Sequence, residues 1–119
     1  MIRVIIERRC RPEKVAEMES LLVDLRTTAM RQRGYISGET LNSVNDPTLW
    51  LVISTWVDVD AWNVWQSSAE RQEMQKKAMS LLIAPERISV FSFARRGGAA
   101  SAHTIGKLEE ARPYIPYGK

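Results

Sequence analysis

Three of the four tryptophans fall within ten residues, in the stretch TWVDVDAWNVWQSS from Thr55 to Ser68. They are Trp56, Trp62 and Trp65. Indole rings can build a hydrophobic core, and they can also form the wall of a pocket for a flat aromatic ligand. For Trp65 both interpretations remain open. For Trp56 and Trp62, packing in the core or at a dimer interface is favoured.

A second candidate is Arg8, in the β-branched segment IRVIIERRCR near the N-terminus. Side chains alternate along a strand, so Arg8 continues the apolar face of that segment. A buried guanidinium could stabilise the anion of a bound phenol. Burial would demand a partner, for which Glu39 is a candidate. The competing interpretation is an arginine at a strand end whose charged head reaches water.

Cys10 and His103 are the only cysteine and the only histidine. Cys10 lies on the same apolar face as Arg8, where a buried packing thiol is favoured over a thiolate activated by neighbouring arginines. His103 follows the small residues GGAASA, and it could serve as a base only if that segment reaches the pocket. One cysteine and one histidine cannot build a Cys/His zinc site, so we expect no metal.

The 119 residues predict one domain, and 45% hydrophobic residues allow a real core. The formal net charge is +3, and the positive residues are scattered rather than concentrated, which argues against nucleic-acid binding. A single cysteine excludes an internal disulfide. Because no apolar run approaches the ~20 residues of a membrane span, we expect a cytoplasmic protein that binds neither nucleic acid nor membrane.

The hydrophobic patterns predict four strands and two helices. We expect strands at 2–11, 35–44, 48–57 and 87–95, and helices at 12–33 and from Asp58 or Asp60 to about residue 84. Gly34 is a plausible cap for the first helix. Ser67 and Ser68 are expected to interrupt the second, because serines compete for backbone hydrogen bonds.

The resulting order is β-α-β-β-α-β, an α+β fold of the ferredoxin-like type with an antiparallel sheet and both helices on one face. The last strand alternates Phe91 and Phe93 with Ile88 and Val90, so it is apolar on both sides. Two helices cover only one side of the sheet. We therefore expect a homodimer in which the uncovered faces of two sheets meet.

The composition changes at Gly97, and we divide the chain into a domain at 1–96 and an arm at 97–119. The arm is rich in small residues and then in proline. Tyr114, Ile115 and Tyr117 are good anchors, and we expect them to pack on the dimer.

Several short motifs together resemble the antibiotic biosynthesis monooxygenase superfamily. They are Trp56 at the end of a strand, the following AWNVWQSS, RPEKVAEMESLL at the start of the first helix, and PERISVFSF in the last strand. The resemblance covers roughly 1–96. It implies a dimeric α/β barrel with a pocket between helices and sheet in each subunit. Members include cofactor-free oxygenases of quinols and polycyclic aromatics, haem-degrading enzymes, isomerases and proteins without assigned activity.

The haem-degrading members use an asparagine in the first strand, and a tryptophan and a histidine in the second helix. Trp65 matches the tryptophan. The histidine position falls near Gln75 and the asparagine position near Arg8. Haem iron needs an axial donor such as histidine, cysteine or tyrosine, so this activity is the less favoured one, and we expect no cofactor.

These observations lead to the hypothesis of a cofactor-independent monooxygenase acting on a quinol-like or polycyclic phenol. Arg8 and Trp65 would be the catalytic residues. The residues expected to line the substrate site are Trp56, Trp62, Gln75, Glu39 and Cys10. The alternative is a non-catalytic dimer that binds a small aromatic ligand or serves as a structural protein. An enzyme should have a cavity of at least a few hundred cubic ångströms with paired polar groups, whereas a structural protein should fill that space with side chains.

Overall fold

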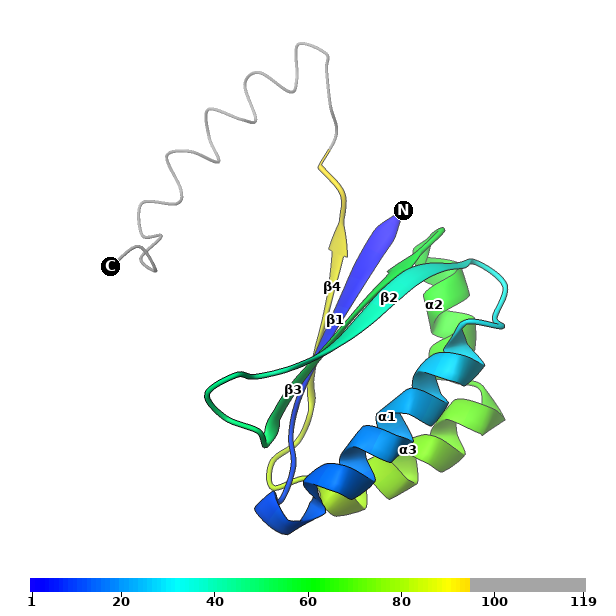
Figure 1. Cartoon of the computed structure of the whole chain (residues 1–119). Coiled ribbons are helices and arrows are strands. Elements are labelled where there is room, and N and C mark those ends of the chain that lie inside the picture. Colours follow the sequence, from blue (N-terminus) through cyan, green and yellow to red (C-terminus); the bar gives the residue numbers. More distant parts are fainter. Residues whose placement is uncertain (95–119) are drawn as a thin grey trace.

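The computed structural model describes residues 1–94, which form one antiparallel sheet with helices packed against one face (Figure 1). The strands are β1 (Ile2–Arg9), β2 (Tyr35–Asn42), β3 (Leu49–Trp56) and β4 (Arg87–Ser92). The helices are the short 3-10 helix η1 (Pro12–Lys14), α1 (Val15–Ala29), α2 (Val59–Gln66) and α3 (Ala69–Leu81). The strand order β2-β3-β1-β4 confirms the predicted ferredoxin-like fold. The predicted arm at 97–119, with His103, lies outside the described residues.

The segment between β3 and β4 forms two helices, divided at the serine pair. The side chain of Asp58 caps α2 by accepting a hydrogen bond from the backbone N–H of Ala61 at 2.9 Å. Ser67 ends α2, and Ser68 caps α3 by accepting from the backbone N–H of Arg71 at 3.2 Å. Serine is a favoured N-cap because its hydroxyl satisfies a free N–H of the first turn. The break places Arg71 in the first turn of α3.

A glycine at position 34 joins α1 to β2 through a left-handed turn. The helix ends at Ala29, so Gly34 is not its cap as predicted. Its φ angle is 89°, a conformation that glycine adopts at little cost. A Cβ atom there would lie 2.5 Å from the Cβ of Ala61 and 2.9 Å from Cγ1 of Val57. Gly34 therefore lets the start of β2 pack closely against the start of α2.

The central strands define the two faces of the sheet. On the face covered by the helices, β1 presents Ile2, Val4, Ile6 and Arg8. The residues of β3 that stand opposite them are Trp56, Ser54, Val52 and Trp50. Alternation along β1 therefore places Arg8 among apolar core residues, as the sequence predicts.

Strand β2 contains a bulge that changes which face its side chains occupy. Tyr35 and Ser37 stand opposite consecutive residues of β3, so Ile36 is an extra residue. One inserted residue moves every later side chain of the strand to the other face. Glu39 therefore lies on the open face of the sheet, whereas Arg8 lies on the covered face. The prediction that Glu39 pairs with Arg8 is wrong for this reason.

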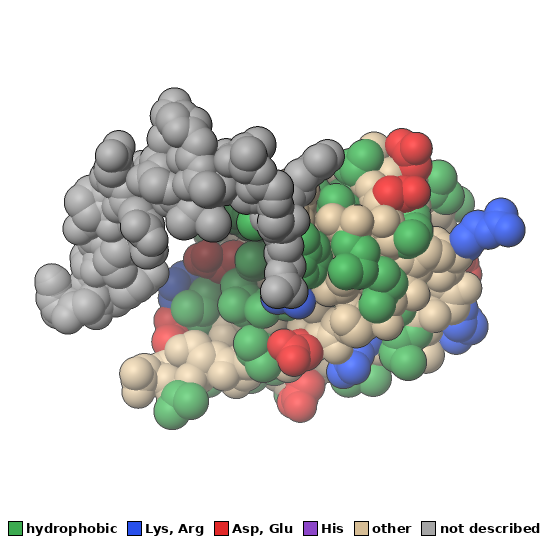
Figure 2. Space-filling model, turned by 90° about the horizontal axis from the view of Figure 1, so that it is seen from above, with side chains coloured by type: hydrophobic (Ala, Val, Ile, Leu, Met, Phe, Trp, Pro, Cys, Tyr) green, Lys and Arg blue, Asp and Glu red, His purple; other side chains and the backbone are tan. Residues whose placement is uncertain are grey.

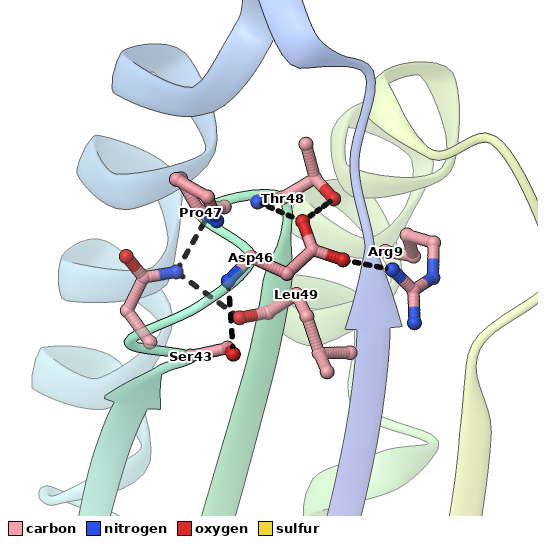
Figure 3. Close-up of polar contacts among 7 residues, drawn as sticks. Arg9, Ser43, Asp46, Pro47, Thr48 and Leu49 are labelled. Carbon is pink, nitrogen blue, oxygen red and sulfur yellow. Dashed lines mark hydrogen bonds and ion pairs between the residues drawn. The ribbon is translucent and has the colours of Figure 1, made fainter.

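The turn between β2 and β3 is held by the side chain of Asp46 (Figure 3). Its carboxylate accepts hydrogen bonds from the hydroxyl of Thr48 at 2.6 Å and from the backbone N–H of Thr48 at 3.1 Å. It also pairs with Arg9 at the end of β1. The two adjacent arginines of β1 thus have different environments. Arg9 is half-exposed and pairs at the surface, whereas Arg8 is buried.

The open face of the sheet is not covered by helices and carries apolar side chains among polar and charged ones. Ile5, Leu51 and Ile53 are half-buried there, and Phe91 is 53% exposed. Beyond the end of β4, the ring of Phe93 lies 5.1 Å from the guanidinium carbon of Arg3. Seen from above, hydrophobic side chains reach the surface in groups between scattered charged ones (Figure 2). Exposed aromatic and aliphatic side chains rimmed by polar ones are typical of an interaction surface.

Candidate functional site

A cavity of about 50 Å³ lies between the helices and the covered face of the sheet. Each of β1, β2, β3, α1, α2 and α3 contributes to its lining. The side chains that matter most to its chemistry are Trp56, Trp62, Trp65, Tyr35, Arg8 and Arg71. The three clustered tryptophans of the sequence therefore do converge on one cavity.

The aromatic wall of this cavity is built around Trp56, which is fully buried. The ring of Trp62 lies 5.8 Å from that of Trp56 at an interplanar angle of 64°, and the ring of Tyr35 lies 5.3 Å from it at 89°. These edge-to-face arrangements are the ones that aromatic quadrupoles favour. The indole N–H of Trp56 donates to the hydroxyl of Ser54 at 3.0 Å. Trp56 is thus satisfied within the core and holds its neighbours in place.

Trp65 contributes to the same wall from α2. It lies three residues after Trp62, so both indoles project from one side of this short helix. Both side chains are buried, with exposed fractions of 3% for Trp62 and 4% for Trp65. The wall also requires Gly38 on β2, because a Cβ atom there would lie 2.3 Å from the hydroxyl oxygen of Tyr35. Only glycine leaves room for the tyrosine side chain to fold back across this strand.

Arg8 is buried beside the aromatic wall, and its side chain is 2% exposed. Its Nε donates to Oε1 of Glu86 at 2.9 Å, and the other oxygen of Glu86 accepts a hydrogen bond from Gln75. The interpretation of Arg8 as a side chain that reaches water is therefore wrong. Burial lowers the pKa of Arg8, and the charge of Glu86 and its hydrogen bond oppose that change. An arginine remains protonated at neutral pH in spite of such a change.

A second buried arginine, Arg71 on α3, was not predicted. Its side chain is 3% exposed, and its guanidinium carbon lies 5.4 Å from the centre of the Trp62 ring. Among residues 1–94, its Nη2 atom has no hydrogen-bond partner. Burial is the main cause that lowers the pKa of Arg71; the charge of Arg8 lowers it further, while Glu86 raises it.

The sequence does contain a signal for Arg71. It occupies the position on α3 that continues the buried stripe formed by Met74, Ala78 and Leu81. Helical spacing places these residues on one face, so an arginine at that position must be buried with them. A charged residue in a buried stripe is costly and indicates a function or a partner.

The buried charges of the site do not cancel. Arg8 and Arg71 carry two positive charges, and Glu86 supplies one negative charge. Arg26 of α1 also lines the cavity and is exposed, which adds positive charge where the cavity approaches the surface. Glu39 contributes to the lining from β2, but its side chain lies on the open face. The site is therefore suited to a ligand with negative charge.

Two predicted site residues lie away from this cavity. Cys10 is fully buried in the core, next to the end of α3. Gln75 borders a separate, more open groove of about 430 Å³ with Met79, Leu82 and Pro85. Within the described part of the chain, no three His, Cys, Asp or Glu side chains converge on a point that could hold a metal ion.

The volume of the cavity bears on the two interpretations of the sequence. About 50 Å³ is far below the few hundred cubic ångströms expected of an enzyme pocket. In this conformation side chains fill most of the space between the helices and the sheet, as expected of a structural protein. Arg8, paired with Glu86, is a polar group of the kind expected of an enzyme, whereas Nη2 of Arg71 forms no hydrogen bond within the described residues.

The sequence profile described as Antibiotic biosynthesis monooxygenase matches residues 1–77, which is well over half of the chain. The chain belongs to the antibiotic biosynthesis monooxygenase family. The predicted resemblance is thereby confirmed. The matched region contains Arg8, Arg71 and the three tryptophans, while Glu86 lies beyond it.

Solved structures show the same fold as this member of the family. A conserved protein from Methanosarcina mazei Go1 is 20% identical with a TM-score of 0.74, covering 78% of this chain and 92% of its own. SnoaB, a cofactor-independent oxygenase from Streptomyces nogalater, is 17% identical with a TM-score of 0.72, covering 82% and 96%. Rv0793 from Mycobacterium tuberculosis is 16% identical with a TM-score of 0.73, covering 82% and 98%. At such identities the likeness concerns the fold alone.

A search of curated proteins found no significant match. Among the described residues of this antibiotic biosynthesis monooxygenase family member, no helix is both long enough and apolar enough to span a bilayer.

Proposed function

We propose that the protein is a cofactor-independent monooxygenase that oxidises a phenolic or quinol-like aromatic compound. The observation that carries this proposal is the surplus of buried positive charge, from Arg8 and Arg71, beside three tryptophans in one cavity. Membership of the antibiotic biosynthesis monooxygenase family supports it. The cofactor-independent oxygenase SnoaB, which has the same fold, is a precedent for such chemistry on this scaffold.

The proposed chemistry uses the substrate as its own electron donor. Positive charge lowers the pKa of a bound phenol and so favours the electron-rich phenolate. The phenolate transfers electrons to dioxygen. With a naphthol as substrate, one oxygen atom becomes the second carbonyl of a naphthoquinone. The other leaves as water, together with the hydroxyl proton and the hydrogen of the attacked carbon, so that atoms and electrons balance.

The contacts divide the roles of the residues. Trp65 and Trp62 would pack against the substrate ring, while Trp56 holds them in place. Because Glu86 compensates the charge of Arg8, Arg71 supplies the charge left over for the substrate oxygen. The role of Arg8 is to hold Glu86 in position through their ion pair. The positions of Gln75 and Cys10 give them no direct contact with a ligand in this cavity.

The cavity must enlarge before a ring can bind. Tyr35 is half-buried and Arg26 is exposed, so these two lining side chains can move at the least cost. The resting volume is about 50 Å³, so a substrate of one or two rings requires less enlargement than a larger polycyclic one. A quinol-like or naphthol-like compound is therefore the substrate class that we propose.

We also propose that the protein is a homodimer joined through the open face of the sheet. Apolar side chains on this face, such as Ile53 and Phe91, are incompletely buried in the single chain. Two such faces in contact would bury them and form the barrel of the predicted dimer. The interface of an obligate dimer buries about 2,000 Å² or more, which an entire sheet face can supply.

Oxygen uptake with naphthol and with the tricyclic anthrone tests the proposed activity. We expect wild type to consume oxygen above the spontaneous rate, with naphthol the better substrate. Trp65→Phe should lower kcat/KM at least tenfold. The matched control is Trp50→Phe, because Trp50 is equally buried but does not line the cavity. If wild type shows no uptake above the spontaneous rate, the non-catalytic dimer becomes the better account.

A further inference from the structure

The Nη2 atom of Arg71 is a buried donor that forms no hydrogen bond with any other group of residues 1–94. Leaving such a donor unpaired costs free energy. Glu86, the carboxylate whose charge acts on Arg71, is already engaged by Arg8 through one oxygen and by Gln75 through the other. Within the described residues Arg71 packs on Trp62, and Oε1 of Gln75, one turn later on α3, is a buried acceptor that likewise forms no hydrogen bond. A ligand acceptor would satisfy Nη2. Proteins retain such destabilising groups where binding or catalysis needs them.

The charge around the cavity defines which ligand would satisfy this donor. Arg8 and Arg71 exceed Glu86 by one positive charge, and the exposed Arg26 borders the same cavity. A ligand with one negative charge would neutralise the buried group, and Arg26 would attract it from solution.

We propose that the site selects aromatic acids, with the ring against Trp62 and Trp65 and the carboxylate accepting a hydrogen bond from Nη2 of Arg71. This inference rests on the proposed function and narrows its substrate class to hydroxylated aromatic carboxylates. A guanidinium binds a carboxylate through strong charge-assisted hydrogen bonds. The contact of Arg71 with the face of Trp62 also orients the guanidinium beside the wall where the ring packs.

The resting cavity must open for an aromatic acid as well as for a neutral phenol. Its volume of about 50 Å³ is far too small for an aromatic ring, so the ring must displace lining side chains such as Tyr35 in order to bind. A carboxylate gains the contact with Arg71 when the cavity opens. A neutral phenol must open the cavity without that gain.

Calorimetric titration in the absence of oxygen tests the inference separately from turnover. The two probes are hydroxynaphthoate and hydroxynaphthamide, which share the ring and the hydroxyl group and differ in charge. At pH 7 we expect wild type to bind the acid at least tenfold more tightly than the amide. Arg71→Met should bring this ratio close to one, and Arg71→Lys should retain part of the preference.

Arg33→Met is the matched control, because Arg33 is exposed, does not line the cavity and carries the same charge. It should leave the ratio unchanged. A wild-type ratio near one overturns the inference, and this result stands even if Arg71→Met does not fold. The inference is also overturned if folded Arg71→Met keeps the preference for the acid over the amide. Acid binding without oxygen uptake would instead contradict the proposed monooxygenase activity and leave the inference intact.

Discussion

Replacing Glu86 with glutamine tests the buried charge cluster. The carboxylate of Glu86 is 12% exposed and lies 2.9 Å from Nε of Arg8, which is 2% exposed. Removing one partner of a buried ion pair costs about 3–5 kcal/mol, because the other charge stays buried without compensation. Glutamine can still accept a hydrogen bond from Arg8, so we expect about 3 kcal/mol. At about 4 °C per kcal/mol for a domain of this size, the melting temperature should fall by about 12 °C.

A double-mutant cycle separates electrostatics from packing. Without Glu86, two buried guanidinium groups repel each other, and removing Arg71 relieves that repulsion. The double variant Glu86→Gln/Arg71→Met should therefore regain about 1–2 kcal/mol relative to Glu86→Gln alone, as expected of residues in one network. Arg71→Met by itself should not lower stability by more than the roughly 1 kcal/mol of its contact with Trp62.

Urea unfolding at pH 7, followed by circular dichroism, measures all four proteins of the cycle. Glu73→Gln is the matched control, because it removes the same charge from an exposed pair with Lys76. Its cost should be below about 0.5 kcal/mol. The reasoning is refuted if Glu86→Gln costs less than about 1 kcal/mol, or if its effect and that of Arg71→Met are simply additive.

Three further predictions concern the fold and its assembly. Gly34→Ala should lower the free energy of unfolding by about 2–4 kcal/mol in urea, because φ is positive and the new Cβ would meet Ala61; a loss below about 1 kcal/mol would contradict the close packing. Hydrogen bonds from Thr48 lower the pKa of Asp46, so its stabilising effect is present at neutral pH and is lost as pH falls through the lowered pKa. Asp46→Asn should flatten the dependence of stability on pH below about pH 4, and an unchanged acid transition would show that the turn does not contribute. Ile53→Asp on the open face should convert the proposed dimer to a monomer in light scattering, and a variant that stays dimeric would place the interface elsewhere.

Local patterns of the sequence were sufficient to predict the fold. Apolar steps of three and four residues marked α1, and alternation marked the faces of β1, because these periods depend only on neighbouring residues. Ser67 and Ser68 marked the break between α2 and α3 through their capping chemistry. The clustering of the tryptophans predicted their convergence, because a strand end and the helix that follows it are close in space.

The polar half of the site could not be predicted in this way. The bulge at Ile36 reverses the faces of β2, and so it separates Glu39 from Arg8. The actual partner, Glu86, lies 78 positions along the chain from Arg8, and only the folded sheet brings them together. Arg71 was detectable from its place on a buried helical stripe. The cavity volume depends on how large side chains interdigitate, which no local pattern encodes.

Oxygenation with labelled dioxygen tests the central claim most directly. Naphthol and the protein are incubated under oxygen-18 gas, and the mass of the naphthoquinone is followed with time. The account predicts one labelled oxygen atom per product molecule, formed faster than in buffer alone and at least tenfold more slowly with Trp65→Phe. A product without label, or labelled product that forms no faster than in buffer, would contradict it.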